Sequence, residues 1–256
     1  MNSASYYPRF CQPLHSHWPL PHALAGAQLV SCQFAPEQVQ PDDVALCGIP
    51  TVKGASKRQA EYLAGRLCAR QALLQLTGTP NVPTVGADRA PCWPEGVTGS
   101  ITHGQRWAAA IVAAKSDYQG LGLDVEKWLS RARAERLAAQ ILTPAELQRL
   151  TQLPIAEQAA RISLTFSLKE SLFKALYPLV QQRFYFQQAE LLFAWLRRLL
   201  PANSPVPFAL SGEPARVDLL LFVHRVQGLQ PGLYWLARCD GQPQPQGLRG
   251  DFSWQR

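Results

Sequence analysis

A regular run of apolar residues is the feature of this chain that most limits its fold. The run predicts one long helix, which has Ser56 as its N-cap and ends at Gly78. The apolar side chains recur three or four residues apart, at Ala60, Leu63, Ala64, Leu67, Cys68 and Leu74, with Gln71 as a polar break. A second face of the same helix carries Arg58, Tyr62, Arg66 and Arg70 every four residues. That basic ridge is either a solvated surface or a clamp for an anion.

Two apolar runs, Trp107–Ala114 and Leu121–Val125, flank a turn-forming segment at 115–120. They predict a β-hairpin or two adjacent strands. Residues 131–142 have helical spacing. Thr143 and Glu146 then form a capping box with Pro144 at the first helical position, which predicts a new helix.

Another helix is predicted to begin after Phe166, with Ser167 and Glu170 as its capping box. Its apolar face consists of Leu168, Leu172, Ala175, Leu176 and Leu179, and Pro178 predicts that it weakens there. Beyond residue 200 a loop at 201–214 precedes two predicted strands, 217–226 and 233–238. The last residues are predicted to be disordered.

The composition is that of an ordinary globular protein, with 47% hydrophobic and 17% charged residues among 256. No apolar run reaches the roughly 18 residues of a membrane span, and the first residues lack a signal-peptide pattern, so a soluble cytoplasmic protein is expected. The six cysteines form no C-x-x-C pair, which favours buried thiols over zinc sites or disulfides. A net charge of +7 suits a polyanionic partner: nucleic acid, nucleotide phosphates or an acidic protein.

Acidic residues supply the first candidate chemistry. Asp124 and Glu126 are two apart on a predicted strand, so both carboxylates point to one face. Such a pair suits Mg²⁺, which prefers a few carboxylates together with substrate phosphates, but it is also common at exposed strand edges. Glu170 is either a helix cap or a third ligand and base, with Lys169 and Lys174 on phosphate.

His103 offers two interpretations, a hydrogen-bonded turn residue or a contact to a phosphate or an attacking hydroxyl. A serine hydrolase built from Ser100, His103 and Asp124 is a rival hypothesis. It is weakened because the chain lacks the G-x-S-x-G elbow at Ser100.

Four ordered blocks resemble the 4′-phosphopantetheinyl transferases of the Sfp/EntD class, nearest to the enterobactin-synthase type. The blocks are Lys57–Arg66, Ala90–Pro94 through Gly99–His103, Gly122–Glu126 and Phe166–Lys174. The resemblance covers residues 10–195 and implies an α+β fold, a pseudo-dimer of two similar α/β halves with coenzyme A between them. The implied parts are an N-terminal half at 1–118, a C-terminal half with the catalytic acids at 119–200, and an atypical, partly disordered segment at 201–256.

The resemblance also implies roles for single residues. Asp124, Glu126 and Glu170 would hold Mg²⁺ on the coenzyme A pyrophosphate, and Glu170 would take the proton of the carrier serine. Lys174 and Lys169 would bind phosphate. Arg58 and Arg66 would grip the 3′-phosphate, joined by Thr102 and His103. The family often has a lysine where this chain has Asp88, so Arg89 is the expected substitute.

The implied reaction moves the 4′-phosphopantetheine arm of coenzyme A to a serine of an apo acyl or peptidyl carrier protein and releases 3′,5′-ADP. A monomer with no nucleic-acid or membrane partner is expected. Two alternatives stay open: a protein that binds coenzyme A or nucleotides without transferase activity, and a metal-dependent phosphodiesterase.

Overall fold

The long helix predicted from the apolar run organises the first part of the molecule. The computed structural model of the chain describes residues 7–16, 18, 24–50, 52–104, 106–181, 183, 185–191, 216–223 and 252–254. Helix α2 runs over Ser56–Thr77, with Ala55 rather than Ser56 at its N-cap position. Gly78 closes it as predicted: its φ of 74° is left-handed, and its N–H donates to the Leu74 carbonyl.

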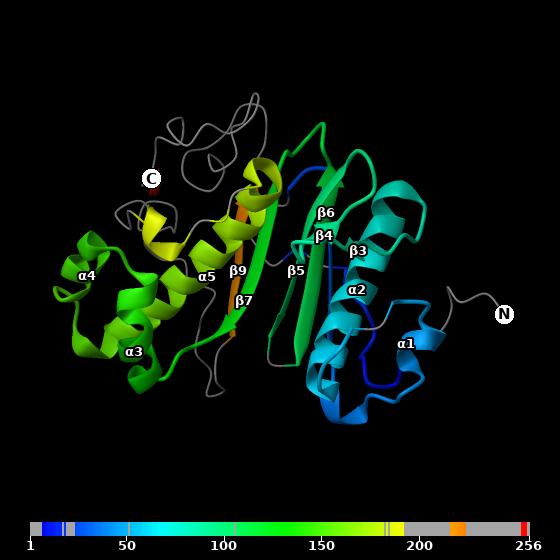
Figure 1. The fold of residues 1–256 in the computed structure, drawn as a ribbon, viewed down its shortest axis with the longest axis horizontal. Helices are drawn as coiled ribbons and strands as arrows, with labels where there is room; N and C mark the ends of the chain where they lie inside the picture. The colour runs from blue at the N-terminus through cyan, green and yellow to red at the C-terminus, as the bar shows by residue number, and fades with distance from the viewer. Residues whose placement is uncertain are drawn as a thin grey trace. The chain divides into compact units, whose positions relative to one another are not determined.

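A four-stranded antiparallel sheet lies against α2 (Figure 1). Its strands are β1 (His15–Ser16), β2 (Gln28–Gln33), β5 (Val97–Gly104) and β6 (Trp107–Ala114), in the order β1-β2-β6-β5. The residues of the predicted apolar stripe are buried there, apart from Leu74, which is 37% exposed. Gly65 lets α2 approach β5, because a Cβ at that position would come within 2.8 Å of the Ile101 side chain.

The predicted pairing of the runs at 107–114 and 121–125 is wrong. Strand β6 forms its hairpin with β5 and pairs on its other side with β2, whereas β7 (Leu121–Lys127) pairs with β9 (Arg216–Val223). Strand β5 is polar in sequence, yet it is buried because its hydroxyls find partners. Thr98 Oγ1 donates to the Gln119 carbonyl at 3.3 Å, and Ser100 Oγ accepts from the Leu123 N–H at 2.9 Å.

Short elements complete the first part: the 3-10 turn η2 (Pro36–Gln38), α1 (Asp43–Leu46), and the two-stranded ribbon β3 (Thr84–Val85) and β4 (Pro91–Cys92). Four of the predicted buried thiols are confirmed, and one cysteine is exposed instead; Cys239 lies outside the described residues. The buried ones are Cys11, Cys32, Cys47 and Cys68, and the exposed one is Cys92.

The chain divides into two compact units, Met1–Leu123 and Asp124–Arg256, which we call unit 1 and unit 2. The predicted boundary after residue 118 lies in the loop before β7. Unit 2 contains α3 (Arg131–Ile141), α4 (Pro144–Leu150), α5 (Ile155–Val180), η3 (Phe186–Gln188), β8 (Ala189–Leu191), β9 and β10 (Phe252–Trp254). Helices and antiparallel pairs are thus mixed along the chain, which is an α+β architecture.

Helix α5 begins twelve residues before the predicted start, so Ser167 and Glu170 are not a capping box. The hydroxyls of Ser163 and Thr165 donate to the carbonyls four residues back, at 2.8 and 2.9 Å, and this lets polar residues continue the helix. Pro178 lies inside the helix, which ends two residues later. The predicted capping box of α4 is confirmed, with Thr143 and Glu146 bonded in both directions.

The structure describes two strands in the C-terminal segment. Strand β9 covers most of the predicted strand at 217–226 and packs against α5. Strand β10, in residues predicted to be disordered, pairs with β8. The predicted loop at 201–214 and strand at 233–238 lie outside the described residues. No helix in the described ranges is long and apolar enough to cross a membrane.

Candidate active site

Asp124 is the centre of the candidate site in unit 2. Strand β7 buries it, leaving 4% of the residue exposed, and α5 provides a partner for each of its two carboxylate oxygens. Ser167 Oγ donates to Oδ2 at 2.7 Å, and Lys174 Nζ donates to Oδ1 at 2.7 Å. Ser167 and Lys174 are seven residues apart, about two helical turns, so they lie on the same face of α5.

Two further carboxylates interact electrostatically with Asp124. Burial raises the pKa of Glu126 to about 7, and the charges of Asp124 and Glu170 add to the rise, against Lys174 and Arg133. Burial also raises the pKa of Glu170, opposed by Lys174 and helped by Asp124. Three acids therefore repel one another around one ammonium group, an arrangement that a divalent cation would relieve.

The donor chemistry of these acids fits Mg²⁺, which takes hard carboxylate oxygens. Their arrangement in this structure differs from a gathered metal site. Among the described residues, no three His, Cys, Asp or Glu side chains are grouped so that they could hold a metal ion. The Lys174 ammonium supplies the positive charge at Asp124 Oδ1.

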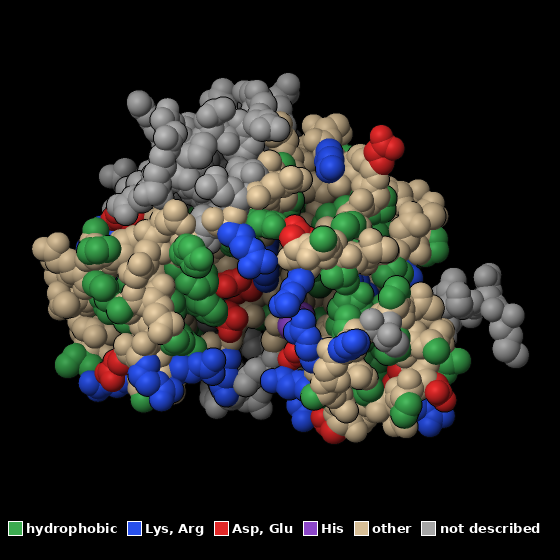
Figure 2. All heavy atoms as spheres, in the orientation of Figure 1, with side chains coloured by type: hydrophobic (Ala, Val, Ile, Leu, Met, Phe, Trp, Pro, Cys, Tyr) green, Lys and Arg blue, Asp and Glu red, His purple; other side chains and the backbone are tan. Residues whose placement is uncertain are grey.

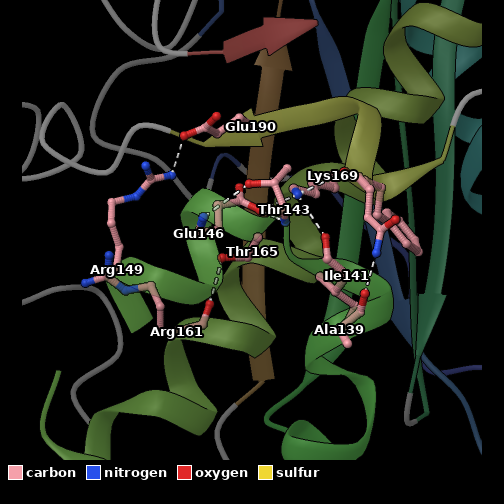
Figure 3. A network of polar contacts seen from close by, with 11 residues as sticks. Ala139, Ile141, Thr143, Glu146, Arg149, Arg161, Thr165, Lys169 and Glu190 are labelled. Carbon is pink, nitrogen blue, oxygen red and sulfur yellow. Dashed lines mark hydrogen bonds and ion pairs between the residues drawn. The ribbon is translucent and has the colours of Figure 1, made fainter. Parts of the chain in front are cut away.

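Lys169 was predicted to bind phosphate, and the structure contradicts this (Figure 3). Its ammonium is buried and donates to Glu146 Oε2 at 2.6 Å, to the Ile141 carbonyl at 2.8 Å and to the Phe186 carbonyl at 2.9 Å. An ammonium has three donors, so none is left for a ligand. Burial lowers the Lys169 pKa, while the Glu146 carboxylate opposes that shift.

The network around Lys169 joins four elements of unit 2. Glu146 Oε2 also accepts from the Thr143 N–H at 2.7 Å, so one carboxylate caps α4 and pairs with α5. Ile141 ends α3 and Phe186 begins η3. Lys169 and Lys174 are five residues apart, which is roughly 140° around a helix. One therefore enters the helical core while the other reaches Asp124.

In unit 1 the predicted basic ridge on α2 separates into different environments. Arg66 is 5% exposed, and its guanidinium carbon lies 5.0 Å from the centre of the Tyr62 ring. Its Nη2 is 3.5 Å from the Thr84 carbonyl, whereas Nε and Nη1 have no hydrogen-bond partner among the described residues. Arg58 is exposed. Arg70 is committed to the fold, because it donates to the Cys47 carbonyl at 2.8 Å.

Thr102 and His103 lie on opposite faces of β5, because successive side chains of a strand alternate. Thr102 is buried, whereas the His103 side chain is 41% exposed with its Nδ1 3.7 Å from Glu61 Oε2 of α2. Ser100 shares the face of Thr102. The hydrolase hypothesis is therefore wrong, since the serine and histidine of its triad point apart. Arg89, with φ of 72°, is exposed between β3 and β4.

Sequence reasoning missed two contacts, that of Ser167 with Asp124 in the candidate site and the structural one of Glu146 with Lys169. Ser167 was assigned to a helix cap, although its seven-residue spacing from Lys174 is a signal that both face the same neighbour. The partnership of Glu146 and Lys169 joins residues 23 positions apart. No local pattern in the chain indicates it.

Comparison with known proteins agrees with the two-part organisation. Residues 51–113 match the 4′-phosphopantetheinyl transferase N-terminal domain, and residues 120–211 match the 4′-phosphopantetheinyl transferase superfamily. Enterobactin synthase component D of Salmonella typhimurium is 37% identical over 166 residues, which cover 63% of this chain and 67% of that protein.

Two further relatives show the same similarity. Enterobactin synthase component D of Escherichia coli O157:H7 is 43% identical over 119 residues, covering 46% of this chain and 55% of the relative. The 4′-phosphopantetheinyl transferase PptT of Mycobacterium tuberculosis is 31% identical over 169 residues, which cover 63% of this chain and 72% of that protein.

Proposed function

Because the chain belongs to the 4′-phosphopantetheinyl transferase superfamily, we propose that the acids around Asp124 form its catalytic centre. The enzyme transfers the 4′-phosphopantetheine arm of coenzyme A to a serine of a carrier protein. The observation that carries the assignment of the centre is the convergence of β7 and α5 on one buried carboxylate, with a lysine and two acids of raised pKa beside it.

The reaction breaks one P–O bond and forms another. The carrier serine oxygen attacks the β-phosphorus of the coenzyme A pyrophosphate, the bond to the bridging oxygen breaks, and 3′,5′-ADP leaves. Glu170 accepts the serine proton. Burial raises its pKa, which makes this carboxylate a stronger base than an ordinary glutamate.

Asp124, Glu126 and Glu170 are the residues that would hold Mg²⁺, which when bound neutralises charge that builds on the pyrophosphate. Lys174 binds a phosphate oxygen in the same proposal. The support for it is that Lys174 is the lysine of α5 whose ammonium pairs with Asp124, while its side chain is still 26% exposed. Lys169 has no part in this binding.

In this proposal, basic side chains of unit 1 bind the 3′-phosphate of coenzyme A. Arg66 is its strongest candidate, because two of its buried nitrogens have no partner among the described residues and a phosphate would satisfy them. Arg58, Arg89 and His103 are exposed basic side chains that would join it. Thr102 is left out, since it points to the other face of β5.

The carrier protein is the second substrate, and an acidic carrier would be attracted by the basic surface of α3. Lys127 is the last residue of β7 and is exposed, and Arg131, Arg133 and Arg136 lie exposed on α3. Figure 2 shows Lys and Arg side chains gathered over this part of unit 2. Complementary charge of this kind raises association rates more than affinity. The proposal also includes a cytoplasmic monomer whose two units are the similar halves of the family's fold.

The direct test is to incubate the protein with coenzyme A, Mg²⁺ and a panel of apo-carrier proteins, and to weigh the carriers. We expect a carrier to gain the mass of the phosphopantetheine arm, and to gain nothing when a chelator removes the metal. Release of 3′,5′-ADP without any carrier gain would identify a phosphodiesterase instead. Binding of coenzyme A with neither product would identify a binding protein.

A further inference from the structure

Three buried serines follow one another at four-residue spacing along α5: Ser163, Ser167 and Ser171. Each is 0% exposed, so no hydroxyl can rely on bulk water. Ser163 Oγ donates to the Ala159 carbonyl at 2.8 Å and accepts from the Leu129 N–H at 2.9 Å. Ser171 Oγ has no partner among the described residues. Ser167 is the member of this row that donates to an acid of the candidate site.

We infer that Ser167 is a positioning residue that fixes the rotation of the Asp124 carboxylate. This inference rests on the proposed metal role of Asp124. Serines in helices commonly bond back to the carbonyl four residues earlier, as Ser163 does. Ser167 instead donates across to β7, at 2.7 Å from Asp124 Oδ2. A short bond between a hydroxyl and a carboxylate is charge-assisted and strongly directional.

Fixing one oxygen determines what the other oxygen can do. With Oδ2 held by Ser167, Oδ1 is the oxygen that meets the Lys174 ammonium at 2.7 Å. A carboxylate that could rotate freely would have to be ordered each time a cation bound. Groups that orient a metal ligand in this way typically contribute 10- to 100-fold to metal affinity.

The test measures Mg²⁺ affinity without turnover, by calorimetric titration of Mg²⁺ into protein saturated with coenzyme A and free of carrier. We expect Ser167→Ala to weaken Mg²⁺ binding about 10- to 100-fold. In the transfer assay the same variant should need more Mg²⁺ for half-maximal rate, with kcat at saturating Mg²⁺ close to wild type. Ser167→Thr keeps the hydroxyl and should restore most of the affinity.

Ser171→Ala is the matched control, because it removes an equally buried hydroxyl from the same helix face without breaking a bond to Asp124. It should bind Mg²⁺ like wild type. Equal weakening in Ser171→Ala and Ser167→Ala would overturn the inference, as would unchanged Mg²⁺ affinity in Ser167→Ala. If Ser167→Thr fails to fold, the Mg²⁺ affinities of Ser167→Ala and Ser171→Ala are enough to test the inference.

Asp124→Asn separates this inference from the proposed function. If it loses Mg²⁺ binding while Ser167→Ala keeps it, the acidic centre stands and the role of Ser167 is wrong. If Asp124→Asn binds Mg²⁺ like wild type, the acids around Asp124 are not the metal site, and both proposals fail.

Discussion

Two lysines of α5, five residues apart, stand in opposite situations. Lys169 is 1% exposed, and its ammonium donates its three hydrogen bonds to Glu146 and to two backbone carbonyls. Lys174 is 26% exposed at its side chain and pairs with Asp124 beside two more acids. The same residue type on the same helix is structural in one place and available for chemistry in the other.

The difference teaches that burial alone does not assign a basic residue to the fold. What assigns Lys169 to the fold is that all three donors of its buried ammonium are satisfied. Arg66 in unit 1 shows the distinction, because it is as buried as a core residue but has two nitrogens without partners among the described residues. A buried cation with spare donors indicates a ligand, and a satisfied one indicates architecture.

The largest expected effect is on stability. Lys169→Met should lower the free energy of unfolding by about 3–5 kcal/mol, because it leaves the buried Glu146 carboxylate without its charge partner. The double variant with Glu146→Gln should recover part of this loss. Urea denaturation measures both. Arg131→Met, which breaks the exposed Arg131–Glu135 pair, is the control and should change stability little. A Lys169→Met protein as stable as wild type would remove the contrast between the lysines.

Lys174→Met should act mainly on transfer. A charge-assisted hydrogen bond to phosphate contributes about 1.5–3 kcal/mol, so kcat/KM for coenzyme A should fall roughly tenfold to a hundredfold. The free energy of unfolding should fall less than in Lys169→Met, because the Lys174 side chain is partly exposed. Kinetics and denaturation of the two methionine variants, run side by side, give the comparison. A larger stability loss at Lys174 would reverse our assignment.

The third prediction concerns Arg66. Arg66→Met should weaken coenzyme A binding by about tenfold or more, by the same reasoning on charged hydrogen bonds. Dephospho-coenzyme A, which lacks the 3′-phosphate, should bind both proteins alike. Arg70→Met is the matched control one turn along α2, because the Arg70 guanidinium is committed to the Cys47 carbonyl. Equal loss of affinity for both ligands would show that Arg66 does not contact the 3′-phosphate.

The smallest expected effect is a pH dependence. The folded protein raises the pKa of Glu126 from its usual value of 4.5 to about 7. Between these values the folded state binds a proton that the unfolded state has released, so this group makes metal-free stability fall as pH rises from about 4.5 to about 7. Mg²⁺ should therefore raise the melting temperature by more at pH 7.5 than at pH 5.5. Equal shifts at both pH values would speak against Glu126 as a ligand.

Local pattern was sufficient for much of the fold. The stripe on α2, its end at Gly78 and the capping box of α4 follow from neighbouring residues, and the structure confirms them. The start of α5 and the partners of β6 could not be predicted in this way. Both depend on polar segments that are stabilised by hydroxyl contacts, some of them between residues far apart in the chain.

The roles of the lysines also depend on distant partners. The resemblance to the family placed Lys169 and Lys174 together on phosphate, because they share one motif. Their separation follows from the rotation of the helix between them and from Glu146, which belongs to another helix. The rotation between the two lysines can be calculated from their spacing in the sequence. The contact of Lys169 with Glu146 is seen only in the folded structure.

The most direct test of the account is the transfer rate of Glu170→Gln at saturating coenzyme A and Mg²⁺, followed by the mass of the carrier protein. Glu170 lies in the middle of α5 and not at its start, so the melting temperature should stay near that of wild type. Loss of a general base costs about 10²–10⁴ in rate, and we expect transfer to fall by at least that much. A folded Glu170→Gln protein that modifies its carrier at the wild-type rate would contradict the central claim that these acids perform the transfer.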